Sequence, residues 1–92
     1  MALFPTTLRR LLKTAGVTQV EFAKRIGVPP GLVNDLLTGR RKPPAAKMAA
    51  FAEGLGLRGQ SREQFLDVAA LAHCPERIQR LIAKRLPDFP EG

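Results

Sequence analysis

The stretch Thr18–Gly39, TQVEFAKRIGVPPGLVNDLLTG, is followed at once by the basic run Arg40-Arg41-Lys42. Thr18 is a favourable N-cap, and Glu21, three residues later, completes a capping box, so a helix is expected to begin here. Gly27 adopts a positive φ more readily than other residues and is expected to end that helix. The stretch therefore predicts two short helices joined by a tight turn, with positive charge directly after the second.

The second of these helices is expected to begin after Val28. Pro29 and Pro30 are tolerated at the start of a helix but not in its interior, which places the boundary between the two helices. Gly39 is expected to end this helix. Its predicted buried face is formed by Val33, Leu36 and Leu37.

Outside this stretch, apolar residues recur at helical spacing and no segment alternates as a strand would. The remaining helices are expected at Thr7–Ala15, Ala45–Leu55, Ser61–Ala72 and from Pro75 to before Pro87. Thr6 or Thr7 is the expected N-cap of the first, and Ser61 with Gln64 forms an expected capping box. Phe22, Met48 and Phe51 are predicted core residues. The fold class is therefore predicted to be all-α.

Length and charge limit the possible functions. The chain has 92 residues, 45% of them hydrophobic, which suits one domain with one core. Its net charge of +7 favours an anionic partner. Nine basic residues lie between Arg9 and Lys47 against only Glu21 and Asp35, whereas six basic residues balance six acidic ones from Met48 onward. The excess charge therefore lies in the half that contains the two short helices.

Several classes of protein are not favoured by the sequence. Cys74 is the single cysteine, so an intramolecular disulfide is excluded. The N-terminus lacks the pattern of a signal peptide, and no apolar run reaches the roughly 20 residues of a membrane span. His73-Cys74 is the one pair that suggests catalysis, but neighbouring helical residues point in different directions. We expect a soluble, cytoplasmic protein that is not an enzyme, with no cofactor and no metal site.

The two short helices of Thr18–Gly39 contain a motif that resembles that of a known family. The sequence is similar to the phage-repressor (Xre/Cro) type of helix-turn-helix protein over about Leu8 to Leu57, on the motif Gln19-x3-Ala23-x3-Gly27-Val28 followed by Val33 and Leu36. A small residue suits position 23 because the two helices cross closely there, and Gly27 suits the turn. The resemblance implies a five- to six-helix bundle of the lambda-repressor-like type that binds duplex DNA.

The resemblance also implies which residues contact the DNA backbone. The position of Gln19, beside Thr18 at the start of a helix, corresponds to a residue that bonds a phosphate. The positions of Arg40, Arg41 and Lys42 correspond to residues that hold the sugar-phosphate backbone.

The base-reading positions implied by the resemblance are Pro30, Gly31, Asn34 and Asp35. Asn34 can pair bidentately with adenine, whereas Asp35 would be repelled by phosphates unless it accepts from a cytosine amino group. Pro30 can pack on a thymine methyl, and Gly31 lets the backbone come close. Few side chains are therefore available for direct readout of bases, and specificity is expected to depend on DNA shape or on a partner protein.

We expect residues 1–57 to form the DNA-binding core, 58–86 to extend the core or form a dimer interface, and 87–92 to be a flexible tail. A homodimer through 61–86 would place two recognition helices about 34 Å apart on a near-palindromic operator, as in a repressor. Two alternatives stay open. One is an antitoxin-like or other protein-interaction module, and the other is a non-specific nucleic-acid-binding protein.

Overall fold

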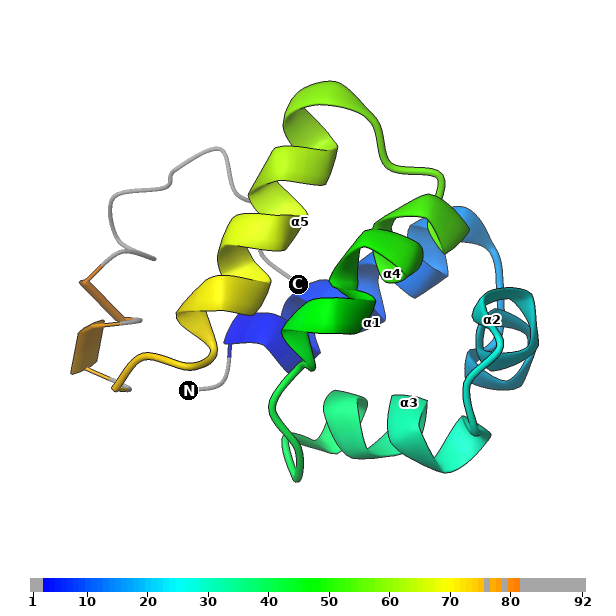
Figure 1. The fold of residues 1–92 in the computed structure, drawn as a ribbon, viewed down its shortest axis with the longest axis horizontal. Coiled ribbons are helices and arrows are strands. Elements are labelled where there is room, and N and C mark those ends of the chain that lie inside the picture. The colour runs from blue at the N-terminus through cyan, green and yellow to red at the C-terminus, as the bar shows by residue number, and fades with distance from the viewer. Residues whose placement is uncertain (1–2, 76, 79, 82–92) are drawn as a thin grey trace.

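The computed structural model describes residues 3–75, 77–78 and 80–81, and this part of the chain is helical without strands (Figure 1). Its elements are α1 (Leu3–Ala15), α2 (Gln19–Ile26), α3 (Pro30–Thr38), the 3₁₀ turn η1 (Ala45–Lys47), α4 (Met48–Gly54) and α5 (Gly59–Leu71). The all-α prediction is confirmed for these residues. None of the described helices is long and apolar enough to cross a membrane.

The two short helices form as their caps predict. The Glu21 N–H donates to Thr18 Oγ1 over 3.1 Å, and the Thr18 N–H donates to Glu21 Oε1 over 2.9 Å. Gly27 ends α2 with φ 73°, and Gly39 ends α3 with φ 78°. Pro30 is the first residue of α3, where the missing N–H costs no helical hydrogen bond. The expected boundaries of α2 and α3 are therefore confirmed.

The start of α1 was predicted incorrectly. The helix begins at Leu3 rather than near Thr7, so neither Thr6 nor Thr7 is an N-cap. Pro5 falls in the first turn, where backbone N–H groups have no helical acceptor, and it therefore does not prevent the earlier start. The longer helix carries Phe4 into the core, where that residue is 1% exposed.

The starts of α4 and α5 also differ from the predictions. The residues after Pro44 first form the turn η1, in which the Lys47 N–H bonds the Pro44 carbonyl over 3.0 Å, and α4 follows at Met48. Helix α5 begins at Gly59, and Arg58 precedes it without a side-chain cap. The expected capping box at Ser61 is therefore wrong, because Ser61 already lies inside the first turn.

The sixth expected helix lies mostly outside the described residues. Among its residues, Arg77, Ile78, Arg80 and Leu81 are helical, and the Ile78 N–H bonds the Pro75 carbonyl over 2.9 Å. The rest of the expected helix and the expected tail at 87–92 belong to the undescribed part of the chain.

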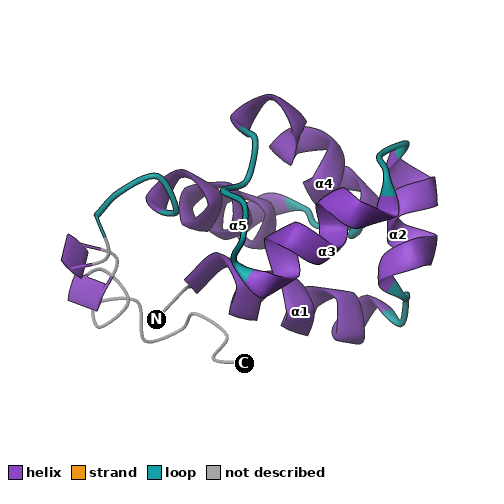
Figure 2. Cartoon of the chain, turned by 90° about the horizontal axis from the view of Figure 1, so that it is seen from below, coloured by secondary structure: helices purple, strands orange, loops and turns teal. Residues whose placement is uncertain are grey.

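One hydrophobic core joins all five α-helices. Helix α1 packs on α3 and α5, α2 packs on α3 and α4, and α4 packs on α5 (Figure 2). The rings of Phe22 and Phe51 meet edge to face with centroids 5.2 Å apart, and those of Phe4 and Phe65 lie 5.7 Å apart. Both ring pairs are the kind of contact that stabilises a small core. Helix α5 therefore belongs to the same core as the two short helices.

Gly54 marks the closest approach of α4 to α2. A Cβ built on it would lie 2.5 Å from Ile26 Cγ2 and 3.2 Å from Phe22 Cε1. The Gly54 carbonyl also accepts from Arg25 Nη1 over 3.1 Å, which ties the ends of the two helices together. The distance between α2 and α4 therefore depends on the absence of a side chain at this position.

We expect Gly54→Ala to lower the free energy of unfolding by about 1–2 kcal/mol, because the overpacking exceeds the gain in helix propensity. Urea denaturation measures the change. Gly31→Ala is the matched control, since Gly31 also lies in a helix without positive φ and a Cβ there meets nothing within 4 Å. The control should be neutral or stabilising, and equal effects of the two substitutions would contradict the close approach at Gly54.

The capping box makes the stability of α2 depend on pH. The pKa of Glu21 is lowered from 4.5, chiefly because the Thr18 N–H donates to the carboxylate, with the Thr18 hydroxyl and the charge of Arg25 acting in the same direction. A carboxyl whose folded-state pKa is lowered stabilises the fold above its ordinary pKa. That contribution is lost as the pH falls through the lowered value.

Glu21→Gln should therefore lower the melting temperature at about pH 7, where the wild-type carboxylate is ionised, and have less effect at about pH 2–3. Thermal denaturation followed by circular dichroism at several pH values tests this. A difference between the two proteins that stays constant over the whole range would show that the charge of Glu21 contributes nothing to the cap.

Candidate nucleic-acid interface

Helix α3 presents one exposed face to solvent. Its buried side is formed by Leu32, Val33 and Leu36. Pro30, Gly31 and Asn34 are exposed on the other side, and Asp35 is half-buried. The four base-reading positions implied by the resemblance therefore fall on the exposed side and one flank of α3, a helix that lies at the lower margin of the molecule in Figure 1 and in front in Figure 2.

The basic loop after α3 is anchored at its start by one carbonyl group. The Asp35 carbonyl accepts from the Arg40 N–H over 2.9 Å, from the Arg41 N–H over 3.3 Å and from Thr38 Oγ1 over 3.2 Å. These bonds fold the loop back on the last turn of α3. The side chains of Arg40, Arg41 and Lys42 are all exposed. Three exposed cations thus follow the C-terminal end of α3, and the backbone of the first two is bonded to its last turn.

The end of the same loop is anchored by His73, a residue whose role the sequence did not reveal. Pro43 is buried, and its carbonyl lies 2.8 Å from His73 Nε2. Because a carbonyl only accepts, Nε2 carries the hydrogen in this bond. The two residues are 30 positions apart, and no motif in the sequence pairs them. The neighbouring Cys74 is half-buried.

The start of α2 combines a cap with a possible anion site. Gln19 is half-buried at the first helical position, directly after Thr18. The Thr18 hydroxyl and the Glu21 carboxylate both occupy first-turn N–H groups, so part of the anion-binding capacity of this terminus is already used. A phosphate contact here would therefore use the N–H groups of Gln19 and Val20, which the cap leaves unused, together with the Gln19 side chain.

Two arginines of the basic half bind helix ends within the protein. Arg9 Nη2 donates to the Leu37 carbonyl in the last turn of α3 over 3.1 Å. Arg25 Nη1 donates to the Gly54 carbonyl at the end of α4. Cations near helix C-termini satisfy carbonyls that lack helical partners and favour the helix dipole. These two arginines therefore also stabilise the positions of α3 and α4.

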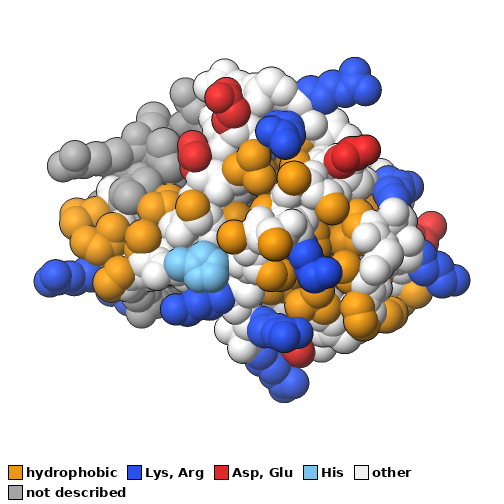
Figure 3. Space-filling view, in the orientation of Figure 1, with side chains coloured by type: hydrophobic (Ala, Val, Ile, Leu, Met, Phe, Trp, Pro, Cys, Tyr) orange, Lys and Arg blue, Asp and Glu red, His pale blue; other side chains and the backbone are white. Residues whose placement is uncertain are grey.

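The surface charge agrees with the location of α3. Lys and Arg side chains are spread over the face shown in Figure 3, and some of them lie at its lower margin, on the side where α3 lies in Figure 1. Within the described residues, no group of three or more His, Cys, Asp or Glu side chains is placed to hold a metal ion. The chemical property that characterises this region is therefore its positive charge, which suits an anionic ligand next to α3.

Comparison with known proteins identifies the fold. The family described as a helix-turn-helix domain matches residues 4–65, about two-thirds of the chain, from α1 into α5. No curated protein and no solved structure is significantly similar to the chain. In a helix-turn-helix domain the second helix of the motif enters the major groove of DNA, which suggests DNA as the ligand. The chain belongs to the helix-turn-helix domain family.

Proposed function

We propose that the protein is a sequence-specific regulator of transcription of the phage-repressor (Xre/Cro) type, which inserts α3 into the major groove of duplex DNA. The observation that carries the proposal is the exposed face of α3 next to a basic loop whose two ends are held by hydrogen bonds. A preordered cationic loop loses little conformational freedom when it binds phosphates. The lambda-repressor-like form of the bundle is part of this proposal.

In this arrangement Gln19 and the loop residues Arg40, Arg41 and Lys42 hold the DNA backbone. Asn34 supplies most of the direct readout by pairing with adenine. Three further positions shape the contact around it, namely Pro30, Gly31 and Asp35. Because few side chains reach base edges, the deformability of the site contributes to specificity.

Repression would follow from occupancy of the operator, without an enzymatic step or a cofactor. As a protein of the phage-repressor type, encoded by a bacterium or by a phage, it would act on DNA in the cytoplasm.

We propose that the protein binds as a homodimer through the C-terminal helices, with residues 1–57 as the DNA-binding part. The buried side of α5 is already used in the core, so the contact would involve its exposed residues, such as Ala70. Ala70 helps to line a depression of about 130 Å³ between α5 and the segment that contains Ala45 and Met48. A second copy seated on it would double the contacts with DNA and favour a near-palindromic operator.

Selection of bound sequences from random duplex DNA at about 150 mM salt tests the proposed function, since non-specific binding is already weak there. An enriched inverted repeat is the expected result. Pro30 and Gly31 have no polar side chains with which to read bases, which favours a rival function, an antitoxin-like protein-interaction module. Such a module would give no enriched sequence in this selection. A non-specific nucleic-acid-binding protein would bind without sequence preference and lose affinity steeply with salt.

Two substitutions separate the proposed roles of backbone and base contacts. Arg41→Ala should weaken binding to all sequences about equally, because it removes a phosphate contact. Asn34→Ala should relax the preference at one base position, at a cost of about 1–3 kcal/mol for the cognate site. Competition binding with single-base variants of the selected site measures both. Identical behaviour of the two mutants would show that Asn34 does not read a base.

The dimer interface predicts a separate effect of Ala70→Arg. Ala70 is exposed on α5, so the substitution should leave the melting temperature nearly unchanged. It should produce a monomer in sedimentation equilibrium and weaken binding to the full inverted repeat more than to a single half-site. A variant that dimerises as the wild type does would place the interface elsewhere.

A further inference from the structure

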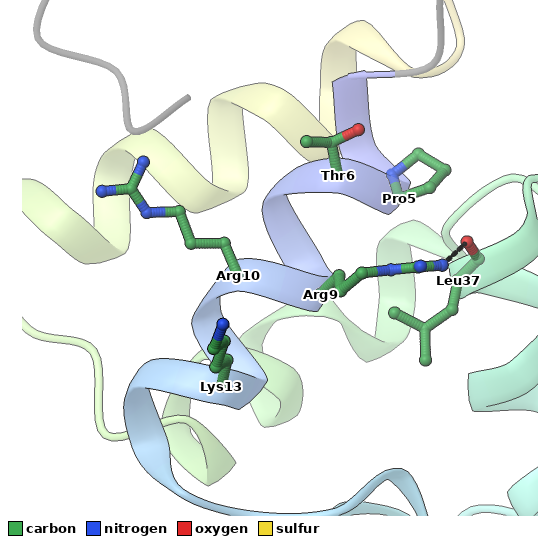
Figure 4. Close-up of a pocket in the computed structure, with 6 residues that line it drawn as sticks. All are labelled: Pro5, Thr6, Arg9, Arg10, Lys13 and Leu37. Carbon is green, nitrogen blue, oxygen red and sulfur yellow. Dashed lines mark hydrogen bonds between the residues drawn. The ribbon is translucent and has the colours of Figure 1, made fainter. Parts of the chain in front are cut away.

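A groove beside α3 has no role in the function proposed above. It has a volume of about 470 Å³ and is lined by Pro5, Thr6, Arg9, Arg10, Lys13 and Leu37 (Figure 4). Five of these residues belong to α1, and Leu37 belongs to the last turn of α3. The groove thus follows the contact between the two helices, with an apolar floor at Pro5 and Leu37 and cations around it.

The cations are arranged along one helix at regular spacing. Arg9 and Lys13 are separated by four residues, so they lie on the same side of α1, about 6 Å apart along its axis. Both are exposed, and Arg10 is half-buried. Arg9 is also fixed in place, because one of its five N–H donors bonds the Leu37 carbonyl while the guanidinium stays exposed. Figure 4 shows its side chain extended from α1 toward that carbonyl.

The groove adjoins the basic loop that follows α3. A Cβ built on Gly39 would lie 3.8 Å from Pro5 Cγ, so the start of the loop passes directly over the N-terminal turns of α1. The exposed cations of α1 and those of Arg40, Arg41 and Lys42 therefore flank the same end of α3. A polyanion that touches the loop can continue along α1 without crossing an acidic side chain of α1, which has none.

The chemistry of the groove fits the backbone of a nucleic acid. A phosphodiester chain presents anionic phosphates at regular intervals with apolar sugar edges between them. Exposed cations at helical spacing match the phosphates, and the surfaces of Pro5 and Leu37 match the sugars. Because Arg9 and Lys13 remain exposed, the site does not require an anion to give up all its hydration, which would be costly.

We propose that α1 is a second phosphate-binding element, with Arg9 and Lys13 gripping the DNA backbone beyond the segment held by the loop. The inference rests on the proposed function, since it assigns an additional part of the same DNA contact. It extends the footprint of one protein molecule past the bases that α3 touches. An acidic segment of a partner protein is the rival occupant of the groove.

The test is the salt dependence of binding to the selected operator. The double variant Arg9→Gln with Lys13→Gln should reduce the slope of log K against log salt by about two, because each phosphate contact contributes about 0.9. Lys13→Gln alone should reduce it by about one. This single variant keeps the bond between Arg9 and Leu37, so its effect does not depend on the packing of α3. Hydroxyl-radical footprinting should show lost protection only at the outer phosphates.

The matched control is Arg58→Gln with Arg62→Gln, which removes the same charge from exposed positions around the start of α5, away from α3 in Figure 1. It should leave the slope and the footprint unchanged. A Lys13 variant with the wild-type slope would overturn the inference and leave the proposed function intact. A wild-type protein without affinity for any duplex would overturn both. Tighter binding of a poly-glutamate peptide than of DNA, abolished by the double variant, would assign the groove to a protein partner instead.

Discussion

The angle between α2 and α3 depends on a turn of only a few residues. Gly27 lies at φ 73°, and the Val28 N–H bonds the Ala23 carbonyl over 3.0 Å, so the chain leaves α2 in one direction. Ala23 is fully buried, which lets the two helices cross closely. A larger side chain at position 23 or a β-branched residue at 27 would change the crossing. It would then change which residues α3 exposes.

The remaining helices hold this pair in place and use part of the positive charge to do so. Arg9 joins α1 to the end of α3, and Arg25 joins α2 to the end of α4. His73 extends the same support from the end of α5 to the Pro43 carbonyl, 30 positions earlier in the sequence. The loop at Arg40–Lys42 lies between two anchors as a result. The backbone at Arg40 and Arg41 is held by hydrogen bonds to the Asp35 carbonyl, which do not depend on the charged groups themselves.

In the proposed DNA complex, different residues would supply affinity and sequence specificity. Phosphate contacts supply affinity that is independent of sequence, and the cations available for them are numerous and preordered. Base-edge contacts supply specificity, and on α3 only Asn34 has a side chain well suited to them. Under the proposed function, selectivity would come from the shape of the DNA site and from the pairing of two subunits. The proposed roles of α5 and of the groove along α1 follow from that requirement.

Local interactions explain why some features were predictable and others were not. The capping box at Thr18, the left-handed turn at Gly27 and the proline at the start of α3 involve residues within a few positions of each other, so the sequence alone determined α2, α3 and the turn between them. The residue patterns typical of helix N-caps predicted the starts of α1 and α5 less reliably. There Pro5 was compatible with an earlier first turn, and the capping box expected at Ser61 did not form.

The sequence by itself determined the all-helical class, the helix-turn-helix motif and the concentration of positive charge in the first half of the chain. Only the tertiary structure decided which of those charges also bind helix ends, as Arg9 and Arg25 do. It also decided that His73 supports the loop at Pro43, and that α1 and Leu37 enclose a cationic groove. The physical reason is that these contacts join residues about 30 positions apart, and their partners are backbone carbonyls. A carbonyl is present at every residue, so no sequence pattern marks the one that the folded chain brings into reach.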